Sequence, residues 1–412
     1  MSLKNVMVAQ SGGPTVAINA SLAGVIRGVM ASDQYETVYG SVNGILGILN
    51  NHLLNLTEIM NENPAYLDRL ETTPAMYLGS CRHKLPDYLD DDSSYVFIFK
   101  QFELYNVGAF FYIGGNDSMD TVMKLSEYFA EIHLDVKVIG IPKTIDNDLP
   151  CTDHTPGFGS AAKYVAITTQ EIVRDSTVYS LPSVTIIEIM GRHAGWLAAS
   201  SCVLRVNGES APHLIYVPEC TFSVKRFLQD VKKEMAKHKA VVVAISEGVS
   251  LDGDAESAYQ SGETDCFGHK YLSGVGKALE QIVRNEIGCK VRSIELNVMQ
   301  RCSSHICSKT DITEAEQIGA AGVRCALKGE TGTVMVFRRV RNMPYTIAIE
   351  SAPASKIANQ ERYLPASFLN AQQNNITNEA LQYFLPLIQG EVQIQMENGL
   401  PKHFTVQEAI LK

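Results

Sequence analysis

The sequence has no excess of positive charge, no apolar run of membrane-spanning length and no apolar signal region at its start. Its formal net charge is −10 at pH 7, whereas nucleic-acid-binding domains are usually basic. No apolar run approaches the roughly 20 residues that cross a bilayer, and the opening MSLKNVMVAQSGG runs directly into a strand-like segment. We therefore expect a soluble, cytoplasmic protein that binds neither nucleic acid nor a membrane.

Cysteine pairs with metal-binding spacing are also missing. The nine cysteines include no C-x-x-C pair, and an odd number without a signal peptide indicates free thiols in a reducing compartment. Low-complexity segments and solenoid-type repeats are absent as well. The 412 residues, 45% of them hydrophobic, suffice for roughly two to three domain-sized cores. Because the chain is acidic overall, an anionic ligand would need local clusters of arginine and lysine.

Apolar strands alternate with amphipathic helices along most of the chain. Strands are expected at 6–10, 107–113, 136–141, 184–190, 214–217, 240–245, 291–299 and 333–337. Helices are expected at 16–29, within 48–75, after 118, and at 165–173, 223–237 and 314–327, with an exposed loop at 251–268. This alternation predicts an α/β fold with two Rossmann-like lobes, whose parallel-type sheets are covered by helices. We expect the active site in the cleft between the lobes, because ligands of such sheets bind where the strands end.

The stretch 142–148, with the sequence PKTIDND, follows a buried strand and carries a lysine and two aspartates. Pro142 cannot donate to a sheet ladder, so the strand should end there. Asp146 and Asp148 are alternate residues and point the same way in an extended segment. Two carboxylates beside a lysine suit a metal-bound phosphate ligand and a hydroxyl that loses a proton. An ordinary polar loop with Asx turns would account for the same residues without any chemistry.

Two other strands end in glycine turns that precede helices. The strand at 6–10 ends in Ser11-Gly12-Gly13, and the strand at 107–113 ends in Gly114-Gly115-Asn116-Asp117-Ser118. A helix that begins after such a turn points backbone N–H groups at a phosphate, and amide or carboxyl oxygens can hold a metal. A bare Ser-Gly-Gly is also a common tight turn, and Asp117 or Ser118 is a plausible N-cap.

Taken together, these loops resemble those of the phosphofructokinase family. The motifs SGGP, LGSCR, GGNDS, PKTIDND, MGRHAGWLA, SEG and MQR follow one another in the order that the family has. The resemblance runs from Ser11 to the strand near 333 and fades over the last sixty or so residues. It implies a glycolytic phosphotransferase with Mg²⁺ as cofactor that phosphorylates O1 of fructose 6-phosphate reversibly. It also implies a homodimer or homotetramer with shared active sites.

The resemblance assigns a role to each matching position. Asp146 is then the general base that accepts the O1 proton. The sugar-phosphate site comprises Thr144, Ile145, Asp146, Met190, Gly191, Arg192, Glu247, Arg292, Val298 and Arg301, with Arg292 supplied by a neighbouring subunit. The phosphoryl donor is held by Gly13, Arg82, Gly115 and Ser118, and Asn116 and Asp148 lie at the magnesium ion. We expect a donor lobe at 1–160, completed by about 300–350, a sugar-phosphate lobe at 161–299, and an appendage at 350–412.

Asp117 and Lys143 indicate which phosphoryl donor is used. ATP-using members of the family usually have glycine at the first position and often at the second, whereas the pyrophosphate-using branch resembles this chain at both. Asp117 adds bulk and negative charge where the α-phosphate of a nucleotide would pass, and Lys143 adds a cation that can hold pyrophosphate. We therefore expect pyrophosphate as the donor, with Asp117 and Lys143 counted among the catalytic residues. The alternatives are an ATP-dependent enzyme, a catalytically silent regulatory subunit, and a related kinase acting on NAD or lipid.

The chain departs from the family pattern at a few places. Asn116 stands where most members have a metal-binding aspartate, and Val298 stands where many ATP-using members have a phosphate-binding histidine. The stretch 179–183 lacks an arginine that the family has shortly before MGR. His193, His269 and His305 lack acidic partners at triad-like spacing and are expected to be structural or surface residues. Trp196 begins a helix and is expected in the core.

Overall fold

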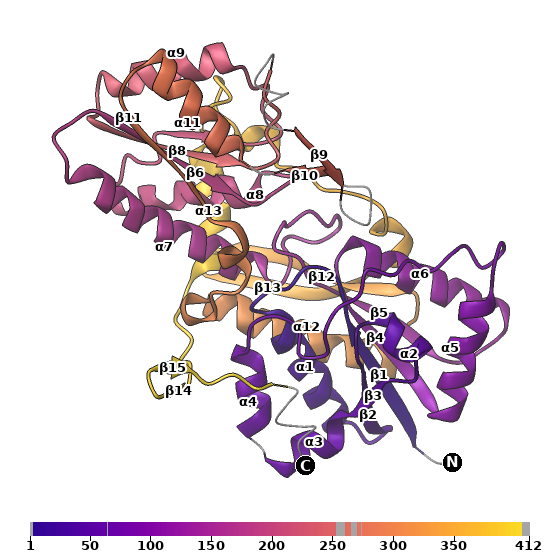
Figure 1. Ribbon diagram of the computed structural model, residues 1–412. Helices are drawn as coiled ribbons and strands as arrows, with labels where there is room; N and C mark the ends of the chain where they lie inside the picture. The colour runs from indigo at the N-terminus through magenta and orange to yellow at the C-terminus, as the bar shows by residue number, and fades with distance from the viewer. Residues whose placement is uncertain (1–2, 64, 253–259, 265–269, 273, 406–412) are drawn as a thin grey trace.

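Two separate β-sheets lie at the centres of two lobes in the computed structural model (Figure 1). The structure describes residues 3–63, 65–252, 260–264, 270–272 and 274–405. The first lobe contains β1 (Lys4–Gln10), β2 (Tyr35–Ser41), β3 (Leu53–Asn55), β4 (Val107–Gly114), β5 (Lys137–Pro142), β12 (Thr333–Asn342) and β13 (Tyr345–Pro353). Their order is β13-β12-β5-β4-β1-β2-β3. The outer pairs β2–β3 and β12–β13 are antiparallel, and the strands between them are parallel.

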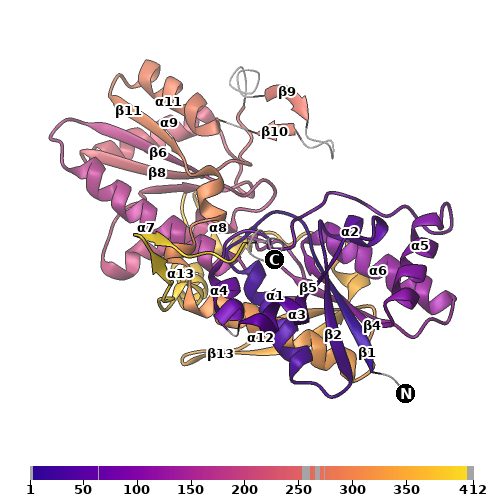
Figure 2. The same cartoon turned by 60° about the horizontal axis from the view of Figure 1, so that its bottom comes forward.

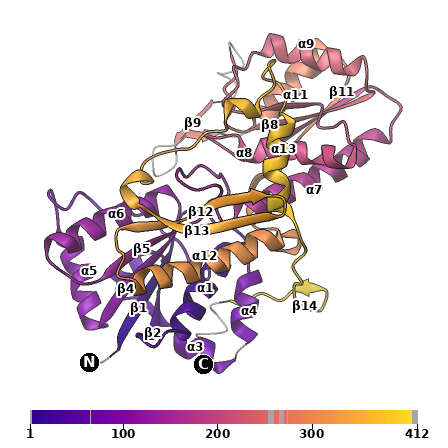
Figure 3. The same cartoon turned by 180° about the vertical axis from the view of Figure 1, so that it is seen from behind.

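Helices cover both faces of this sheet because its strands carry apolar side chains on both faces. Val6 and Val8 of β1 pack in one core, and the alternate residues Met7 and Ala9 pack in the core on the opposite face. The helices of this lobe are α1 (Ile18–Met30), α2 (Ile45–Leu49), α3 (Leu56–Glu62), α4 (Ala65–Thr72), α5 (Ser93–Leu104), α6 (Asn116–Glu131) and α12 (Lys309–Leu327). Seen from behind, α12 runs along the sheet beside α1 (Figure 3).

The second lobe is built around a smaller, fully parallel sheet. It contains β6 (Ser183–Ile189), β7 (Leu214–Tyr216), β8 (Ala240–Ser246) and β11 (Lys290–Glu295), in the order β11-β6-β8-β7. Its helices are α7 (Phe158–Thr177), α8 (Trp196–Ser200), α9 (Val224–Met235), α11 (Val275–Glu286) and α13 (Asn378–Phe384). The two sheets stay apart in the turned view of Figure 2. The predicted α/β fold with helix-covered, largely parallel sheets in two lobes is confirmed.

Short elements complete the described chain. The 3₁₀ helices are η1 (Ser201–Asn207), η2 (Asn297–Arg301), η3 (Ser304–Ile306), η4 (Ala354–Lys356), η5 (Ala366–Phe368) and η6 (Leu385–Ile388). The small antiparallel pairs are β9 (Gln260–Thr264) with β10 (Lys270–Leu272), and β14 (Met396–Glu397) with β15 (Leu400–Pro401). No helix within the described ranges is both long and apolar enough to cross a bilayer. Every cysteine whose state the structure describes is a free thiol.

Several predicted elements differ from the structure. The strand expected at 291–299 ends at Glu295, where its pairing with β6 ends, and η2 follows and carries Arg301 at the cleft lining. The loop expected at 251–268 contains β9, while 253–259 and 265–268 lie outside the described residues. The helical stretch expected at 48–75 includes β3, and β13 was not predicted at all. Both are edge strands whose pairing depends on distant neighbours, which local periodicity does not reveal.

The chain passes between the lobes repeatedly. It leaves the first lobe after β5, returns through α12, and crosses again after β13 in the yellow segment of Figure 3. Phe368 and Phe384, from the segment expected as an appendage, are buried in the second lobe. Phe404 is buried in the first lobe, where its ring lies 5.1 Å from that of Tyr77. The last part of the chain therefore packs into both lobes, while the functional division at 160 and 299 stays a prediction.

Candidate active site

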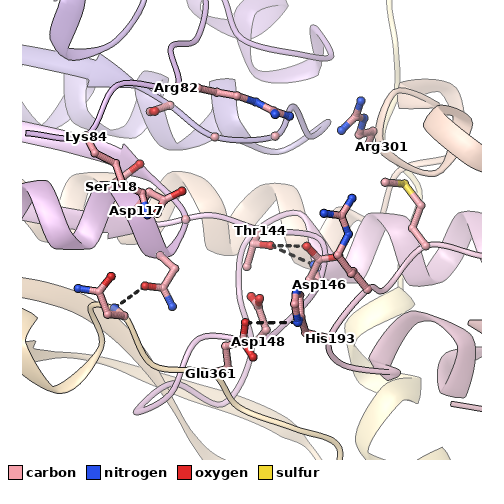
Figure 4. A pocket seen from close by; sticks show the side chains of 18 of the residues that line it. Arg82, Lys84, Asp117, Ser118, Thr144, Asp146, Asp148, His193, Arg301 and Glu361 are labelled. Carbon is pink, nitrogen blue, oxygen red and sulfur yellow. Dashed lines mark hydrogen bonds and ion pairs between the residues drawn. The ribbon is translucent and has the colours of Figure 1, made fainter. Parts of the chain in front are cut away.

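The loops that follow β1, β4, β5, β6 and β8 open onto one cleft of about 670 Å³ (Figure 4). It is lined by Ser11, Gly12, Gly13, Cys81, Arg82, His83, Lys84, Tyr112, Gly115, Asn116, Asp117, Ser118, Thr144, Asp146, Asp148, Met190, Arg192, His193, Glu247, Arg301, Asn359, Glu361 and Tyr363. The carboxyl ends of parallel strands meet at one edge of a sheet, so polar residues distant in sequence converge there. Most of the predicted site residues thus lie around one space.

One wall of the cleft is formed by the two glycine turns of the first lobe. Gly12 has φ +83°, and a Cβ at this position would lie 3.0 Å from Lys143 Nζ, so only glycine fits without strain. Gly115 is the N-cap of α6, a helix of 16 residues whose first turn faces the cleft. Backbone N–H groups at such a helix end favour an anion. Arg82 adds a guanidinium group on the same wall.

Asp117 is paired with a lysine that the sequence analysis did not single out. Lys84 Nζ lies 2.8 Å from Asp117 Oδ1, and both side chains are about half exposed (54% and 55%). The hydrogen bond to Asp117 raises the pKa of Lys84, which keeps this lysine charged. The negative charge expected from Asp117 is therefore balanced locally.

The loop between β5 and α7, residues 143–157, carries the two carboxylates, and it is called the catalytic loop here because of the role proposed for Asp146 below. Asp146 accepts a hydrogen bond at Oδ2 from Thr144 Oγ1 (3.4 Å), and the Asp146 N–H donates to Thr144 Oγ1 (3.1 Å). Lys143, the first residue of this loop, is buried and donates from Nζ to the Gly13 carbonyl at 2.7 Å. This contact joins the catalytic loop to the first glycine turn, even though Lys143 is absent from the cleft lining.

Burial shifts the pKa values of the ionisable groups around this loop. It raises the pKa of Asp146, and it raises the pKa of Asp148 to about 7 with a further contribution from the Asp146 carboxylate. Burial also raises the pKa of Glu247 to about 7 and lowers the pKa of Lys143 to about 7, against the attraction of Asp146. Groups poised near neutrality are typical of sites that move protons or bind charged ligands.

The opposite wall comes from the second lobe and from η2. Met190, Arg192, Glu247 and Arg301 line it, and the Gly191 N–H donates to Glu247 Oε1 at 3.3 Å. A Cβ at Gly13 would lie 3.6 Å from Arg301 Nη1, so Arg301 reaches close to the glycine turn of the first lobe. In Figure 4, Arg82 and Arg301 approach the same space as Thr144 and Asp146. Cations and a carboxylate thus surround one volume.

Not every predicted residue reaches the cleft lining. Ile145 is buried in the core of the second lobe, and Gly191 contributes its backbone N–H group. Val298 is 46% exposed on η2. Arg292 lies outside the cleft lining, on β11, where its Nη1 pairs with Asp175 Oδ2 at 3.0 Å. Within a single chain, Arg292 and Val298 are therefore not brought to the cleft.

Other cleft residues were missed from the sequence. Lys84 lies two positions after Arg82, beyond the end of the LGSCR motif, and Glu361 and Tyr363 belong to the segment expected as an appendage. His193 was expected to be structural or on the surface. It lines the cleft, 50% exposed, with Nδ1 3.8 Å from Glu361 Oε1. Its place inside MGRHAGWLA was the signal that could have identified it.

The structure also shows whether His305 and Trp196 are exposed or buried. His305 is exposed on η3, and His269 lies outside the described residues. Trp196 is 2% exposed, as expected for the core.

The cleft offers hard oxygen donors that fit Mg²⁺ together with phosphate oxygens and water. Asp146 and Asp148 both line it. Asn116 fits this role less well, because its Oδ1 accepts from the Asn359 N–H and its Nδ2 donates to the Gln360 carbonyl, both at 2.5 Å. The described residues contain no cluster of three or more histidine, cysteine or acidic side chains that could hold a metal alone. A bound phosphate ligand would therefore have to supply part of the coordination.

The fold and the cleft together define a class of two-lobed α/β proteins with a polar cleft between the lobes. A family model described as Phosphofructokinase matches residues 5–326. A pyrophosphate–fructose 6-phosphate 1-phosphotransferase of Xanthomonas campestris pv. campestris is 40% identical over 409 residues, which cover 98% of this chain and 97% of the relative. The enzyme of that name from Halomonas elongata is 37% identical over 405 residues, which cover 98% and 96%.

The fold is also similar to that of a solved structure from the same family. The pyrophosphate-dependent phosphofructokinase from Nitrosospira multiformis superposes with a TM-score of 0.85 at 33% identity, covering 98% of this chain and 96% of that one. The chain belongs to the phosphofructokinase family. The resemblance noted from the sequence motifs is confirmed.

Proposed function

We propose that the protein transfers a phosphoryl group from pyrophosphate to O1 of fructose 6-phosphate, giving fructose 1,6-bisphosphate and phosphate. The observation that carries this proposal is the place of Asp146, which lies in one cleft between the glycine turns of the first lobe and the arginines of the second. Full-length relatives named for the same reaction support it. A cleft with glycine turns on one wall and arginines on the other suits a reaction in which two phosphorylated substrates meet end to end.

The residues have distinct roles in this reaction. Asp146 accepts the proton of the O1 hydroxyl while O1 bonds to the transferred phosphorus and the bridging P–O bond breaks. Arg301 and Arg192 bind the sugar phosphate, with Met190 and Glu247 against the sugar. The glycine turns and Arg82 hold the donor, Lys143 adds positive charge behind the first glycine turn through its bond to the Gly13 carbonyl, and the departing phosphate stays near them. Phosphoryl transfer depends on alignment and charge neutralisation more than on covalent help.

Magnesium would be held by Asp148, with Asp146 beside it. When bound, this ion neutralises negative charge on the phosphate oxygens and aligns them. We propose Asn116 as a minor contributor, since its amide oxygen already accepts a hydrogen bond from the Asn359 N–H.

Pyrophosphate is the proposed donor because the Lys84–Asp117 pair stands at the first turn of α6. The α-phosphate of a nucleotide would have to pass this point, whereas pyrophosphate ends before it. The rivals are an ATP-dependent kinase and a silent regulatory subunit. Asp146, Asp148, Arg192 and Arg301 around one cleft count against the silent subunit.

A donor-swap assay tests the proposal. Purified protein is given fructose 6-phosphate, Mg²⁺ and either pyrophosphate or ATP, and fructose 1,6-bisphosphate is detected through aldolase coupling. We expect turnover with pyrophosphate and little with ATP. A preference for ATP would show that the assignment of pyrophosphate as donor is wrong. Binding of fructose 6-phosphate without turnover from either donor would support the alternative of a catalytically silent regulatory subunit. Formation of pyrophosphate from fructose 1,6-bisphosphate and phosphate tests the proposed reversibility.

We also propose a cellular location and an oligomeric state for the enzyme. Glycolytic use in the cytoplasm follows from the proposed reaction and from the free thiols. A homodimer or homotetramer with shared sites is proposed because Arg292 lies outside the cleft of its own chain.

A further inference from the structure

The catalytic loop has a backbone conformation that needs support. Asn147 and Cys151 have φ values of +56° and +64°, a region that non-glycine residues seldom occupy. Asn147 is fully buried, and its Oδ1 has no hydrogen-bond partner among the described residues. Such conformations persist only where the surrounding structure holds them. Groups outside the loop must therefore fix the position of Asp146 and Asp148 on either side of Asn147.

Arg362, in the C-terminal part of the chain, supports this loop directly. Its guanidinium donates to the Asn147 carbonyl from Nε (3.2 Å) and Nη2 (2.8 Å). Its Nη1 donates to the carbonyls of Thr152 (2.6 Å) and Asp153 (2.7 Å). The Arg362 N–H also donates to the Asp148 carbonyl at 2.7 Å. One planar side chain thus joins two parts of the loop, at 147 and at 152–153, a geometry that a lysine ammonium cannot reproduce.

The guanidinium is itself held against the second lobe. Arg362 Cζ lies 4.4 Å from the centre of the Trp196 ring, and Trp196 Nε1 donates to the Arg362 carbonyl at 3.2 Å. The next contact along the chain is the Leu364 N–H, which donates to Glu219 Oε1 at 2.8 Å. Glu219 also accepts from the Gly195 N–H at 3.1 Å, so this end is tied to the loop that carries Arg192.

Residues 359 and 360, which precede Arg362, contact α6, whose start lies on the wall of the cleft that is proposed to hold the phosphoryl donor. Asn359 Nδ2 donates to Asp120 Oδ1 at 2.8 Å, and the backbone of 359–360 pairs with the Asn116 side chain at the start of α6. Residues 359–364, here called the C-terminal strap, therefore contact the donor helix, the catalytic loop and the second lobe. They lie outside the 5–326 segment that the family model matches.

Tyr383 supports the same loop from a second direction. Its hydroxyl donates to the Asp153 carbonyl at 2.5 Å and accepts from Asn147 Nδ2 at 3.0 Å. Its ring packs against Trp196 and Phe384, so removal of the hydroxyl alone would leave the core filled.

We propose that Arg362, assisted by the Tyr383 hydroxyl, is a positioning residue that holds the catalytic loop in its reactive conformation and ties it to both substrate walls through the C-terminal strap. This inference rests on the proposed phosphotransferase function. Because Arg362 is absent from the cleft lining, its loss should misplace the reacting groups more than it weakens either substrate. Small displacements of a reacting group are costly, on the order of 100-fold for about 1 Å.

Steady-state kinetics of Arg362→Lys tests the proposal. We expect kcat to fall about 10- to 100-fold, while KM for each substrate stays within about three-fold. Arg338→Lys is the matched control, because Arg338 is an exposed arginine of β12 that pairs with Glu350. Ethylguanidinium should restore part of the kcat of Arg362→Ala but leave Arg338→Ala unchanged. The loss of kcat at a nearly constant KM is the readout that a purely structural role would not produce.

Tyr383→Phe tests whether the catalytic loop needs this support if the Arg362 variants fail to fold. Loss of one hydroxyl should lower kcat about three- to ten-fold with both KM values kept. The proposal is overturned if folded Arg362→Lys keeps kcat within two-fold of the wild type, or if the loss is confined to KM. It is also overturned if the Arg362 variants are insoluble and Tyr383→Phe has wild-type kcat. The kcat and KM values of each variant are compared with those of the wild type, measured with the donor that the wild type uses. A wrong donor assignment therefore does not affect this test.

Discussion

Lys84 Nζ lies 2.8 Å from Asp117 Oδ1, at the point where α6 begins beside the cleft. Because of this ion pair, the negative charge of Asp117 is no longer the main reason to expect that it excludes ATP. A lone carboxylate about 4 Å from a phosphate oxygen would cost on the order of 4 kcal/mol at an effective dielectric near 20. A half-exposed carboxylate with a lysine beside it repels far less, so the volume of the pair becomes the larger obstacle to a nucleotide.

We therefore predict different effects for the two partners. Asp117→Gly should raise kcat/KM for ATP relative to pyrophosphate, because it removes that volume. Lys84→Met should lower kcat/KM for pyrophosphate about ten-fold, because it removes a cation and leaves Asp117 unpaired. Lys137→Met, which disrupts an ion pair with Asp135 away from the cleft lining, is the control. An unchanged donor ratio in Asp117→Gly would remove Asp117 as the cause of selectivity.

Proton uptake should accompany pyrophosphate binding near neutral pH. Burial lowers the pKa of Lys143 to about 7, and an adjacent polyanion would raise it again. Calorimetry at pH 7.5 in buffers of different ionisation enthalpy should show net proton uptake by the wild type, and less by Lys143→Met. Equal uptake by both proteins would separate Lys143 from donor binding.

Lys143→Met should also stabilise the ligand-free protein at neutral pH. The folded-state pKa of Lys143, about 7, lies below the unfolded value of about 10.5. Between these values the unfolded chain binds a proton that the native protein does not, so stability rises with pH across the window. The advantage of Lys143→Met in urea denaturation should therefore be large at pH 7 and small near pH 10. A constant difference would contradict the lowered pKa.

Asp146→Ala should lower kcat by roughly 10²- to 10⁴-fold, with substrate affinity kept within a few-fold, because a general base acts in the transition state. Initial rates at varied concentrations of each substrate separate the two parameters. Near-normal turnover would exclude Asp146 from the role of base.

Arg292 should act across a subunit boundary. It pairs with Asp175 in its own chain and lies outside the cleft lining. Mixing inactive Arg292→Ala and Asp146→Ala subunits should restore part of the activity, because some sites would then combine an intact Asp146 with an intact Arg292. Native mass spectrometry confirms subunit exchange in the mixture. No recovery after demonstrated exchange would count against a shared site.

Sequence patterns were most informative where structure is local. The strands before the glycine turns and at Pro142 were placed within two residues at each end, because continuous apolar runs between glycine and proline signals indicate buried strands. The loops that follow them meet at the cleft by the geometry of parallel sheets. Edge strand β13 and the early end of β11 were missed, since pairing partners rather than propensity decide them.

By itself, the sequence determined the α/β class, the family and the loops that carry Asp146, Arg192 and Arg301, because these depend on periodicity and on contiguous motifs. The tertiary structure alone decided the partners of these loops. Asn116 bonds to Gln360, 244 residues away, and Arg362 holds Asn147 across 215 residues. Such contacts follow from how the two lobes and the last segment pack. No local pattern of hydrophobicity or charge encodes them.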